Sequence, residues 1–196
     1  MKTWITSLAL ASLGLSYSGH AQVHVEANIG QYNTAMQQYS VDTLRVQDRD
    51  TGFNIQMGYA IDDRATLTLG YVNQGEGYAV LWTDTLNPSA YHQQVASVAP
   101  VLAEGYTVGA EYALLTDETW QFTTEFGLFR WHADIESQMI GQTTQRTTLN
   151  DFDLYGGFKA RYAISEHWDI HVGVRHYQMQ THVNSISLGI TRYFGN

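Results

Sequence analysis

Apolar residues recur at every second position, with polar residues or glycine between them, over most of the chain between Val23 and Phe194. Successive side chains of a β-strand point to opposite faces, so this period predicts strands with one apolar face and one polar or glycine-containing face. We expect eight strands, each close to the roughly 9 to 11 residues that a tilted strand needs to cross a bilayer. The predicted strands are residues 23–32, 51–59, 65–73, 104–113, 119–131, 150–162, 167–177 and 183–194.

The connections between these strands alternate in length. The short ones are residues 60–64, 114–118 and 163–166, and the long ones are residues 33–50, 74–103 and 132–149, followed by a brief connection at 178–182. Short periplasmic turns opposite long extracellular loops are typical of outer-membrane barrels. The pattern therefore predicts an all-β fold, a transmembrane, antiparallel, up-and-down β-barrel of eight strands.

Aromatic residues gather at the turn side of the apolar face. Folding each short turn back on itself brings residues of the same face together, with Tyr59 opposite Ala65 at the first turn. The resulting row of rings is Tyr59, Tyr112, Trp120, Tyr162, Trp168 and Phe194. Such rings suit the headgroup level of a bilayer and predict a membrane-interface girdle, whereas a soluble sandwich or lipocalin-like barrel would hide its apolar face.

The polar face of the predicted strands carries many charged residues. When this face lines the lumen, the inward-pointing residues are Glu26, Glu111, Glu125, Asp153, Lys159, Arg161, Asp169, His171 and Arg175. Arg161 is then expected across the third turn from Asp169. The interior of an eight-stranded barrel is just wide enough for side chains, so we expect a packed polar network that plugs the lumen. A gated proton or ion path is the alternative.

Composition narrows the class of protein. Lys2, an apolar run over residues 5–15 and small residues before Gln22 predict a signal peptide at residues 1–21, followed by the barrel at residues 22–196. The chain has no Cys, which excludes a disulfide framework and a thiolate metal site. Its formal net charge of -9 argues against a nucleic-acid partner.

Two segments carry a family resemblance. The hairpin of residues 168–177 and 183–194, and the run Thr66-Leu-Thr-Leu-Gly-Tyr71 after an acidic turn, resemble the OmpA/OmpX-like family of small outer-membrane β-barrels. The chain is also similar to the accessory colonisation factor A group of such barrels. The resemblance implies the bacterial outer membrane of a Gram-negative cell and no cofactor. It also implies outer-membrane lipid, lipopolysaccharide, the barrel assembly machinery during insertion, and a host surface or matrix as partners.

Candidate chemistry is sparse in this sequence. Lipid A deacylases carry a His-x-Ser pair, but the position two after His176 is a glutamine, which is not a nucleophile. His24-x-Glu26 and His132-x-Asp134 have the spacing of ligand pairs on a strand, yet two ligands do not make a metal site. We expect lumen packing for the first pair, a solvated loop for the second, no metal and no enzymatic activity.

The connection at residues 74–103 is too long for mere closure of a hairpin. Its contact candidates are Tyr78, Trp82 and Tyr91. The loop is expected either to protrude as a β-ribbon or partner-binding surface, or to fold back over the barrel mouth. The first functional hypothesis is a non-enzymatic barrel whose loops serve envelope integrity or adhesion and colonisation contacts. The alternatives are a conduit for small hydrophobic molecules resembling the OmpW group, and a lipid A-modifying enzyme.

Overall fold

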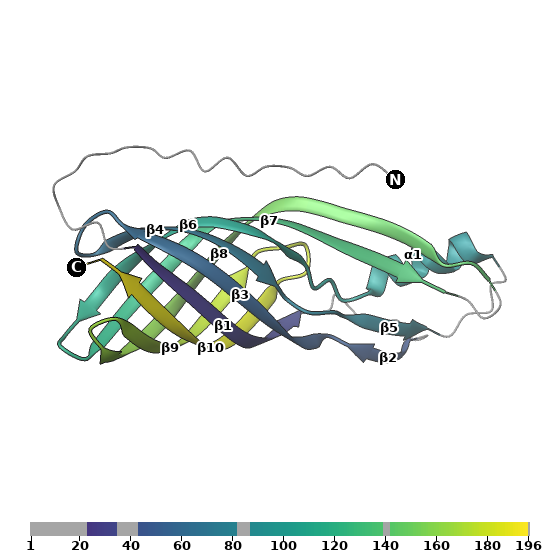
Figure 1. The fold of residues 1–196 in the computed structure, drawn as a ribbon. Coiled ribbons are helices and arrows are strands. Elements are labelled where there is room, and N and C mark those ends of the chain that lie inside the picture. The colour runs from purple at the N-terminus through teal and green to yellow at the C-terminus, as the bar shows by residue number, and fades with distance from the viewer. Residues whose placement is uncertain (1–22, 35–42, 82–86, 139–141, 196) are drawn as a thin grey trace, which may run out of the picture.

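The computed structural model describes residues 23–34, 43–81, 87–138 and 142–195. Eight strands in this part of the chain form a closed barrel in the order β1-β10-β9-β8-β7-β6-β4-β3 (Figure 1). They are β1 (Val23–Thr34), β3 (Arg49–Ala60), β4 (Ala65–Asn73), β6 (Glu104–Thr116), β7 (Trp120–Ser137), β8 (Gln145–Ser165), β9 (Trp168–Tyr177) and β10 (Val183–Phe194). The predicted fold class is confirmed, and each predicted strand overlaps one of these eight. The predicted signal peptide, residues 1–21, lies outside the described residues.

Neighbouring strands of the barrel are antiparallel throughout. The barrel closes at β1, where Val23 lies opposite Phe194 of β10 on one side and Tyr59 of β3 on the other. A closed sheet has no free edge in its wall, so the backbone N–H and C=O groups of the wall are paired within the sheet. Any β-structure in hydrocarbon has to meet this condition, because lipid offers no hydrogen-bonding partner.

The outer face of the barrel is apolar and open to its surroundings. In mid-strand, Leu69, Phe126 and Leu188 expose 51%, 59% and 58% of their surface. A continuous exposed apolar band of this kind is expected in a bilayer and is unfavourable in water. The apolar face predicted from the sequence is therefore the outer face of the barrel, which contacts lipid.

Aspartates shape two of the short turns, which lie at one end of the barrel, here called the turn end. Asp62 accepts hydrogen bonds from the backbone N–H groups of Arg64 and Ala65, and Asp117 accepts an equivalent pair in the second turn. Because these bonds stabilise the charged form, they lower the pKa of both carboxyls below the usual value.

The first turn sets a register that differs by two residues from the predicted one. Tyr59 lies opposite Leu67 rather than Ala65, because β3 continues through Ala60, which pairs with Thr66, so the hairpin bends one residue later along the chain. The third turn shows the same difference, because β8 continues to Ser165, which pairs with Trp168, so the hairpin bends later along the chain than predicted. A shift of two residues keeps every side chain on its face, so the inward and outward sets are unchanged.

The hairpin of β7 and β8 continues beyond the barrel at the opposite, loop end (Figure 1). β7 pairs with β6 only as far as His132, but with β8 as far as Ser137. The prediction of a loop over residues 132–149 is therefore wrong. Strand alternation persists there, with Ala133 and Ile135 buried and Asp134 exposed, and the pairing with β8 continues.

The connection at 74–103 both projects and folds back. Its strand β5 (Tyr78–Leu81) pairs with β2 (Thr43–Gln47) as a separate two-stranded sheet, and its helix α1 (Pro88–Val98) lies against β5, β7 and β8. Its last residues, Leu102 and Ala103, are buried in the core at the barrel mouth. Within the described residues, no helix has the length and apolar character needed to cross a membrane.

A lipid-facing charge tests the position of the apolar band. Replacing Leu188 by Arg is expected to lower the free energy of unfolding by about 2–4 kcal/mol, because the guanidinium would lie in hydrocarbon. The matched change Asn184→Arg, on the same face of β10 near the loop end, should cost about 0–1 kcal/mol. Urea unfolding in lipid vesicles measures both losses, and equal values would contradict this position of the band.

Candidate functional site

The lumen is the first candidate, because it holds most of the predicted site residues. Eight of the nine predicted inward residues are buried, namely Glu26, Glu111, Glu125, Lys159, Arg161, Asp169, His171 and Arg175. The ninth, Asp153, is half-buried nearer the loop end, where it accepts a hydrogen bond from the Trp131 indole at 2.7 Å. Small residues on the inner face leave room for this packing: a Cβ at Gly189 would lie 2.1 Å from the Asn28 Oδ1.

A central ion cluster fills the middle of the lumen. We use this name for the six residues Glu26, Glu111, Glu125, Lys159, Arg161 and Arg175. Lys159 is the hub, because its Nζ lies at 2.7, 2.6 and 3.1 Å from Glu26, Glu111 and Glu125. One ammonium thus faces three carboxylates, and it needs further cations beside it to balance them.

Two arginines supply that balance. Arg161 bridges Glu26 and Glu111, with its Nη2 2.5 Å from the latter. Arg175 binds both oxygens of Glu125, at 2.6 Å from its Nε and 2.7 Å from its Nη2. Bidentate pairs of this kind are the strongest and most directional ion pairs in proteins. The central ion cluster therefore contains three acids and three bases, with each charge paired.

The cluster also ties opposite walls of the barrel together. Its carboxylates project from β1, β6 and β7, and its cations from β8 and β9. Removing one partner of a buried ion pair typically costs about 3–5 kcal/mol, since the other charge is left without compensation. The six side chains are consequently interdependent, and the lumen is a packed polar core.

The predicted position of Arg161 relative to Asp169 is wrong in detail. Arg161 lies opposite His171, because of the register shift near the third turn. The two charged groups are joined through Tyr193 instead: its hydroxyl donates to Asp169 Oδ2 at 2.6 Å and accepts from Arg161 Nη1 at 3.1 Å. His171 Nε2 in turn lies 2.5 Å from the Asn28 Oδ1.

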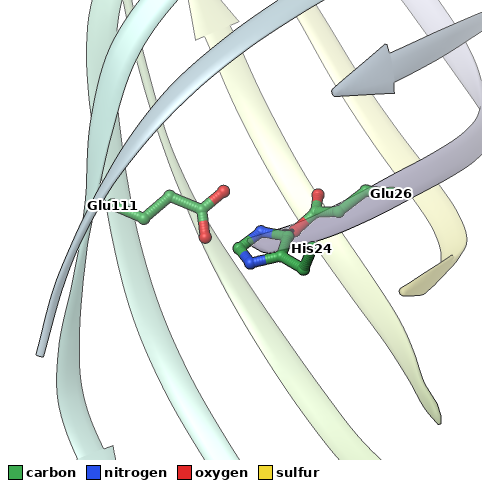
Figure 2. A group of neighbouring side chains, drawn as sticks. All are labelled: His24, Glu26 and Glu111. Atoms are coloured by element: carbon green, nitrogen blue, oxygen red, sulfur yellow. Dashed lines mark ion pairs between the residues drawn. The ribbon is translucent and has the colours of Figure 1, made fainter. Parts of the chain in front are cut away.

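His24 and two residues of the central ion cluster, Glu26 and Glu111, have the composition of a metal site. Figure 2 shows His24, Glu26 and Glu111 pointing toward one another inside the barrel, and their ligand atoms lie within 4.8 Å of one another. The two carboxylates, however, already receive the ammonium of Lys159 and the guanidinium of Arg161. These protein cations occupy the place that a metal ion would take, so the geometry fits an ion cluster better than a metal centre.

An aromatic layer, which we define as Tyr32, Phe129, Tyr155 and Tyr177, lies above the cluster toward the loop end. The Phe129 and Tyr177 rings are 5.0 Å apart, and the Arg175 guanidinium lies 5.1 Å from the centre of the Tyr155 ring. Above it, Val72, Leu102, Ala103, Trp131, Ala133, Met179 and Val183 complete one apolar core. The sequence reading missed this layer, although Tyr32 and Tyr177 share the inward period of Glu26 and Arg175.

Little free space remains between these layers. A cavity bordered by Asn28, Lys159 and Arg175 has a volume of about 10 Å³. That is close to the space needed by one water molecule. This cavity, between described residues of the ion cluster and the aromatic layer, is therefore too small for a ligand larger than water.

The predicted girdle residues lie on the outer face at the turn end. All six are exposed, and the Trp120 ring meets the Tyr162 ring edge-on at 5.0 Å. Arg192 lies among them, with its guanidinium 5.2 Å from the centre of the Trp168 ring and 5.1 Å from that of the Phe194 ring.

At the loop end, α1 is attached to the hairpin of β7 and β8 by a histidine that the sequence reading did not single out. The buried His92 Nδ1 lies 2.7 Å from the Ser137 hydroxyl, and its Nε2 lies 2.7 Å from the Thr147 hydroxyl. No spacing in the sequence pointed to this contact, because it joins three separate segments.

The three predicted loop-contact residues have different surroundings. Tyr78 is exposed on β5, with the Arg45 guanidinium 5.7 Å from its ring centre. Tyr91 is half-buried on α1. Trp82 lies outside the described residues. His132, expected in a solvated loop, is instead on β7, 3.0 Å from Glu104.

His176 lies on the outer face near the loop end. Its ring stacks on that of His182 at 5.2 Å, and its Nδ1 lies 2.8 Å from the Asn184 side-chain oxygen. Within the described chain, the side chains that contact His176 are thus an imidazole and an amide, and the position two residues after it is Gln178.

The chain matches the family model for the outer membrane protein beta-barrel domain over residues 5–194. A search of curated proteins by sequence finds no match. Among solved structures it is similar to Ail, the attachment invasion locus protein of Yersinia pestis, in complex with the heparin analogue sucrose octasulfate. That likeness has 14% identity and a TM-score of 0.56, covering 90% of this chain and 100% of the other.

Two further solved structures are similar to the same extent. The N-terminal β-barrel domain of Pseudomonas aeruginosa OprF has 14% identity and a TM-score of 0.55, covering 90% of this chain and 99% of the other. Neisserial surface protein A has 14% identity and a TM-score of 0.54, covering 88% and 97%. At these identities the likeness establishes the fold.

Lys159 tests the interdependence of the central ion cluster. The variant Lys159→Met is expected to lose about 3–5 kcal/mol of unfolding free energy, because three buried carboxylates lose their shared ammonium. Adding Glu111→Gln should recover part of this loss, since it removes one uncompensated charge. Urea unfolding measures both variants, and a single variant as stable as the parent would contradict a charge-balanced cluster.

Proposed function

The chain belongs to the family of outer membrane protein β-barrel domains, and from this premise we propose that it is a non-enzymatic surface protein whose extracellular part makes adhesive contacts. In this family, short turns face the periplasm and longer connections face the outside. The extracellular projection then consists of β2, β5, α1 and the β7–β8 hairpin beyond His132.

The packing of charged and aromatic side chains inside the barrel is the observation that carries the proposal. A conduit needs a passage, but the ion cluster and the aromatic layer fill the interior and leave a cavity of about 10 Å³ beside Lys159. A binding function of the part outside the barrel is therefore better supported than transport through the lumen. This argument also disfavours the alternative of a path for small hydrophobic molecules, which would meet six charged side chains.

The extracellular projection supports a contact role because it is built as a structure in its own right. The hairpin pairs continuously from the barrel wall to Ser137, and α1 is fixed against it by His92. Ordered side chains lose less freedom on binding a partner than those of a flexible loop. Exposed Tyr78 adds a ring of the type enriched at interfaces.

The surface charge bears on the kind of contact. Ail is described with a heparin analogue, a polyanion. The projection of this chain has a groove on one side, which is bordered by the guanidinium of Arg146, the imidazole of His132 and five carboxylates: Asp50, Glu76, Glu104, Asp134 and Glu136. Like charges repel at an interface, so we expect a partner other than a sulfated glycan.

Attachment of cells tests the proposal. Bacteria producing the intact chain are expected to attach to immobilised matrix proteins or cultured epithelial cells, and attachment should fall to the level of non-producing cells when the projection is trimmed. The trimmed variant replaces residues 75–102 and 133–149 by short Gly-Ser turns, which removes β5, α1 and the hairpin beyond His132. It leaves β2 and the barrel pairs up to His132 and Asn150 in place.

The control is the folding of the trimmed barrel, judged by its gel mobility with and without heating. Lys159→Met provides a second control, because it perturbs the lumen and leaves the projection unchanged. Undiminished attachment by a folded, trimmed barrel would contradict the proposal.

Ion conductance tests the closed lumen independently. The purified barrel in a planar bilayer is expected to show no sustained current, since each charge of the central ion cluster is paired and the cavity beside Lys159 has room for about one water molecule. Stable channels in the nanosiemens range would contradict a plugged lumen and would favour the conduit function.

A further inference from the structure

One side of the extracellular projection is a groove with an open strand edge. The groove has a volume of about 640 Å³. One wall is β7 from His132 to Glu136, and the other is formed by residues 75–77 and 100–103. Concave sites of this size are in the range that binding sites occupy.

The strand edge arises because β7 extends further toward the loop end than its neighbour β6. Glu104, the first residue of β6, pairs with His132, and beyond this pair β7 continues for residues 133–137. These residues pair with β8 on one side, and no strand of the described chain pairs with them on the other. An unpaired edge presents a row of backbone N–H and C=O groups that can accept an added strand.

The helix leaves this edge accessible. α1 is fixed to the inward-facing side chains of the hairpin, through the contacts of His92 with Ser137 and Thr147. No residue of α1 borders the groove. The opposite wall is held in place at its base, where Gln74 N–H donates to the Ala103 carbonyl at 3.0 Å and the Gln74 side chain accepts from the Ala103 N–H at 3.0 Å.

Charge selects the kind of strand that could pair there. Five carboxylates border the groove, against the guanidinium of Arg146 and the imidazole of His132: Asp50, Glu76, Glu104, Asp134 and Glu136. Arg146 pairs with both Asp134 and Glu136, and His132 lies 3.0 Å from Glu104, so the groove still has more carboxylates than cationic side chains. A second copy of this chain would bring the same acids to the edge and be repelled.

The alternation of β7 adds a second selection. Asp134 is exposed on one face of the edge strand, while Ala133 and Ile135 face the other side and are buried. In an antiparallel pair, directly opposed side chains lie about 4.5–5.5 Å apart and interact. Basic residues at alternate positions of an added strand would therefore lie beside Asp134 and Glu136, two carboxylates that share the one guanidinium of Arg146. Apolar residues would lie beside Ala133 and Ile135.

We infer that this groove binds an extended peptide segment with alternating basic and apolar residues, which adds as a strand to the free edge of β7. The inference rests on the proposed contact function and names the class of partner. Main-chain hydrogen bonds supply the pairing, and the acidic walls supply the preference for Lys and Arg.

A labelled peptide of alternating Lys and Val, added to the full chain in lipid nanodiscs, tests this by fluorescence anisotropy. Saturable binding is expected, and it should weaken as salt is raised, because exposed charges are screened. The same peptide with N-methyl groups on alternate residues keeps its charge but loses the N–H donors of one edge. It should bind at least about tenfold more weakly, a difference of about 1.4 kcal/mol.

Charge reversal on both walls tests the role of the groove. The double variant E76K/E136K is expected to weaken binding of the Lys-Val peptide by at least about tenfold. The matched control is the same charge reversal on both Asp63 and Glu118, exposed residues of two periplasmic turns at the other end of the barrel, and it should bind like the parent. Gel mobility with and without heating establishes that both variants are folded.

Three results would overturn the inference: no saturable binding, equal binding of the N-methylated peptide, or equal losses in the groove variant and the turn variant. The outcome is separable from the proposed function. If trimming the projection abolishes cell attachment while the peptide does not bind, the groove inference fails and the contact function stands. If the peptide binds as described while attachment never depends on the projection, the groove stands and the adhesive role fails.

Discussion

The pairing of buried charges inside a closed sheet is the interaction on which the rest of this structure depends. Lipid requires the barrel to present its apolar residues outward, and the period of the strands then sends the polar residues inward. A charge in that interior is tolerated only when it is compensated. Lys159, with three carboxylates from three strands around it, meets this condition in a way that no pair of neighbouring strands could.

This balance has a consequence for where function can lie. A lumen filled by six interdependent ion-pairing side chains and an aromatic layer is a core, and changes there act first on stability. The stability of the barrel depends less on the projection, because its hairpin and helix hold together through their own contacts, such as those of His92. The two ends of the molecule are thus under different constraints, with stability concentrated in the barrel and contact surfaces concentrated outside it.

Period-two alternation predicts the eight strands, and the loop lengths and the row of rings at the turn end make the apolar face the outer one. The inward position of residues such as Glu26 and Arg175 then follows from the face that each residue occupies. Pairing was harder to predict. Tyr59 lies opposite Leu67 instead of Ala65, and Arg161 opposite His171 instead of Asp169. Turn geometry and a local irregularity set these registers, and a shift of two residues leaves no trace in the hydrophobic pattern.

The loop end was the least predictable part for a related reason. Alternation through Ala133, Asp134 and Ile135 is present in the sequence, but it lies beyond the roughly 9 to 11 residues that a membrane strand needs, so membrane crossing does not require a strand there. The contact of His92 with two hydroxyls joins segments that only the folded chain brings together. Contacts that depend on tertiary proximity alone carry no periodic signal.

The continuous ladder between β7 and β8 also gives the molecule a mechanical property. The ladder runs from the turn end, where Trp120 pairs with Tyr162, to the tip, where Ser137 pairs with Gln145. Hydrogen bonds in an antiparallel sheet are perpendicular to the strands. A pull on the tip away from the membrane therefore loads the bonds of this hairpin to β6 and β9 in shear, so that many must fail together rather than one after another. A surface held at this tip would be anchored to the whole barrel wall and would share the load among its strands.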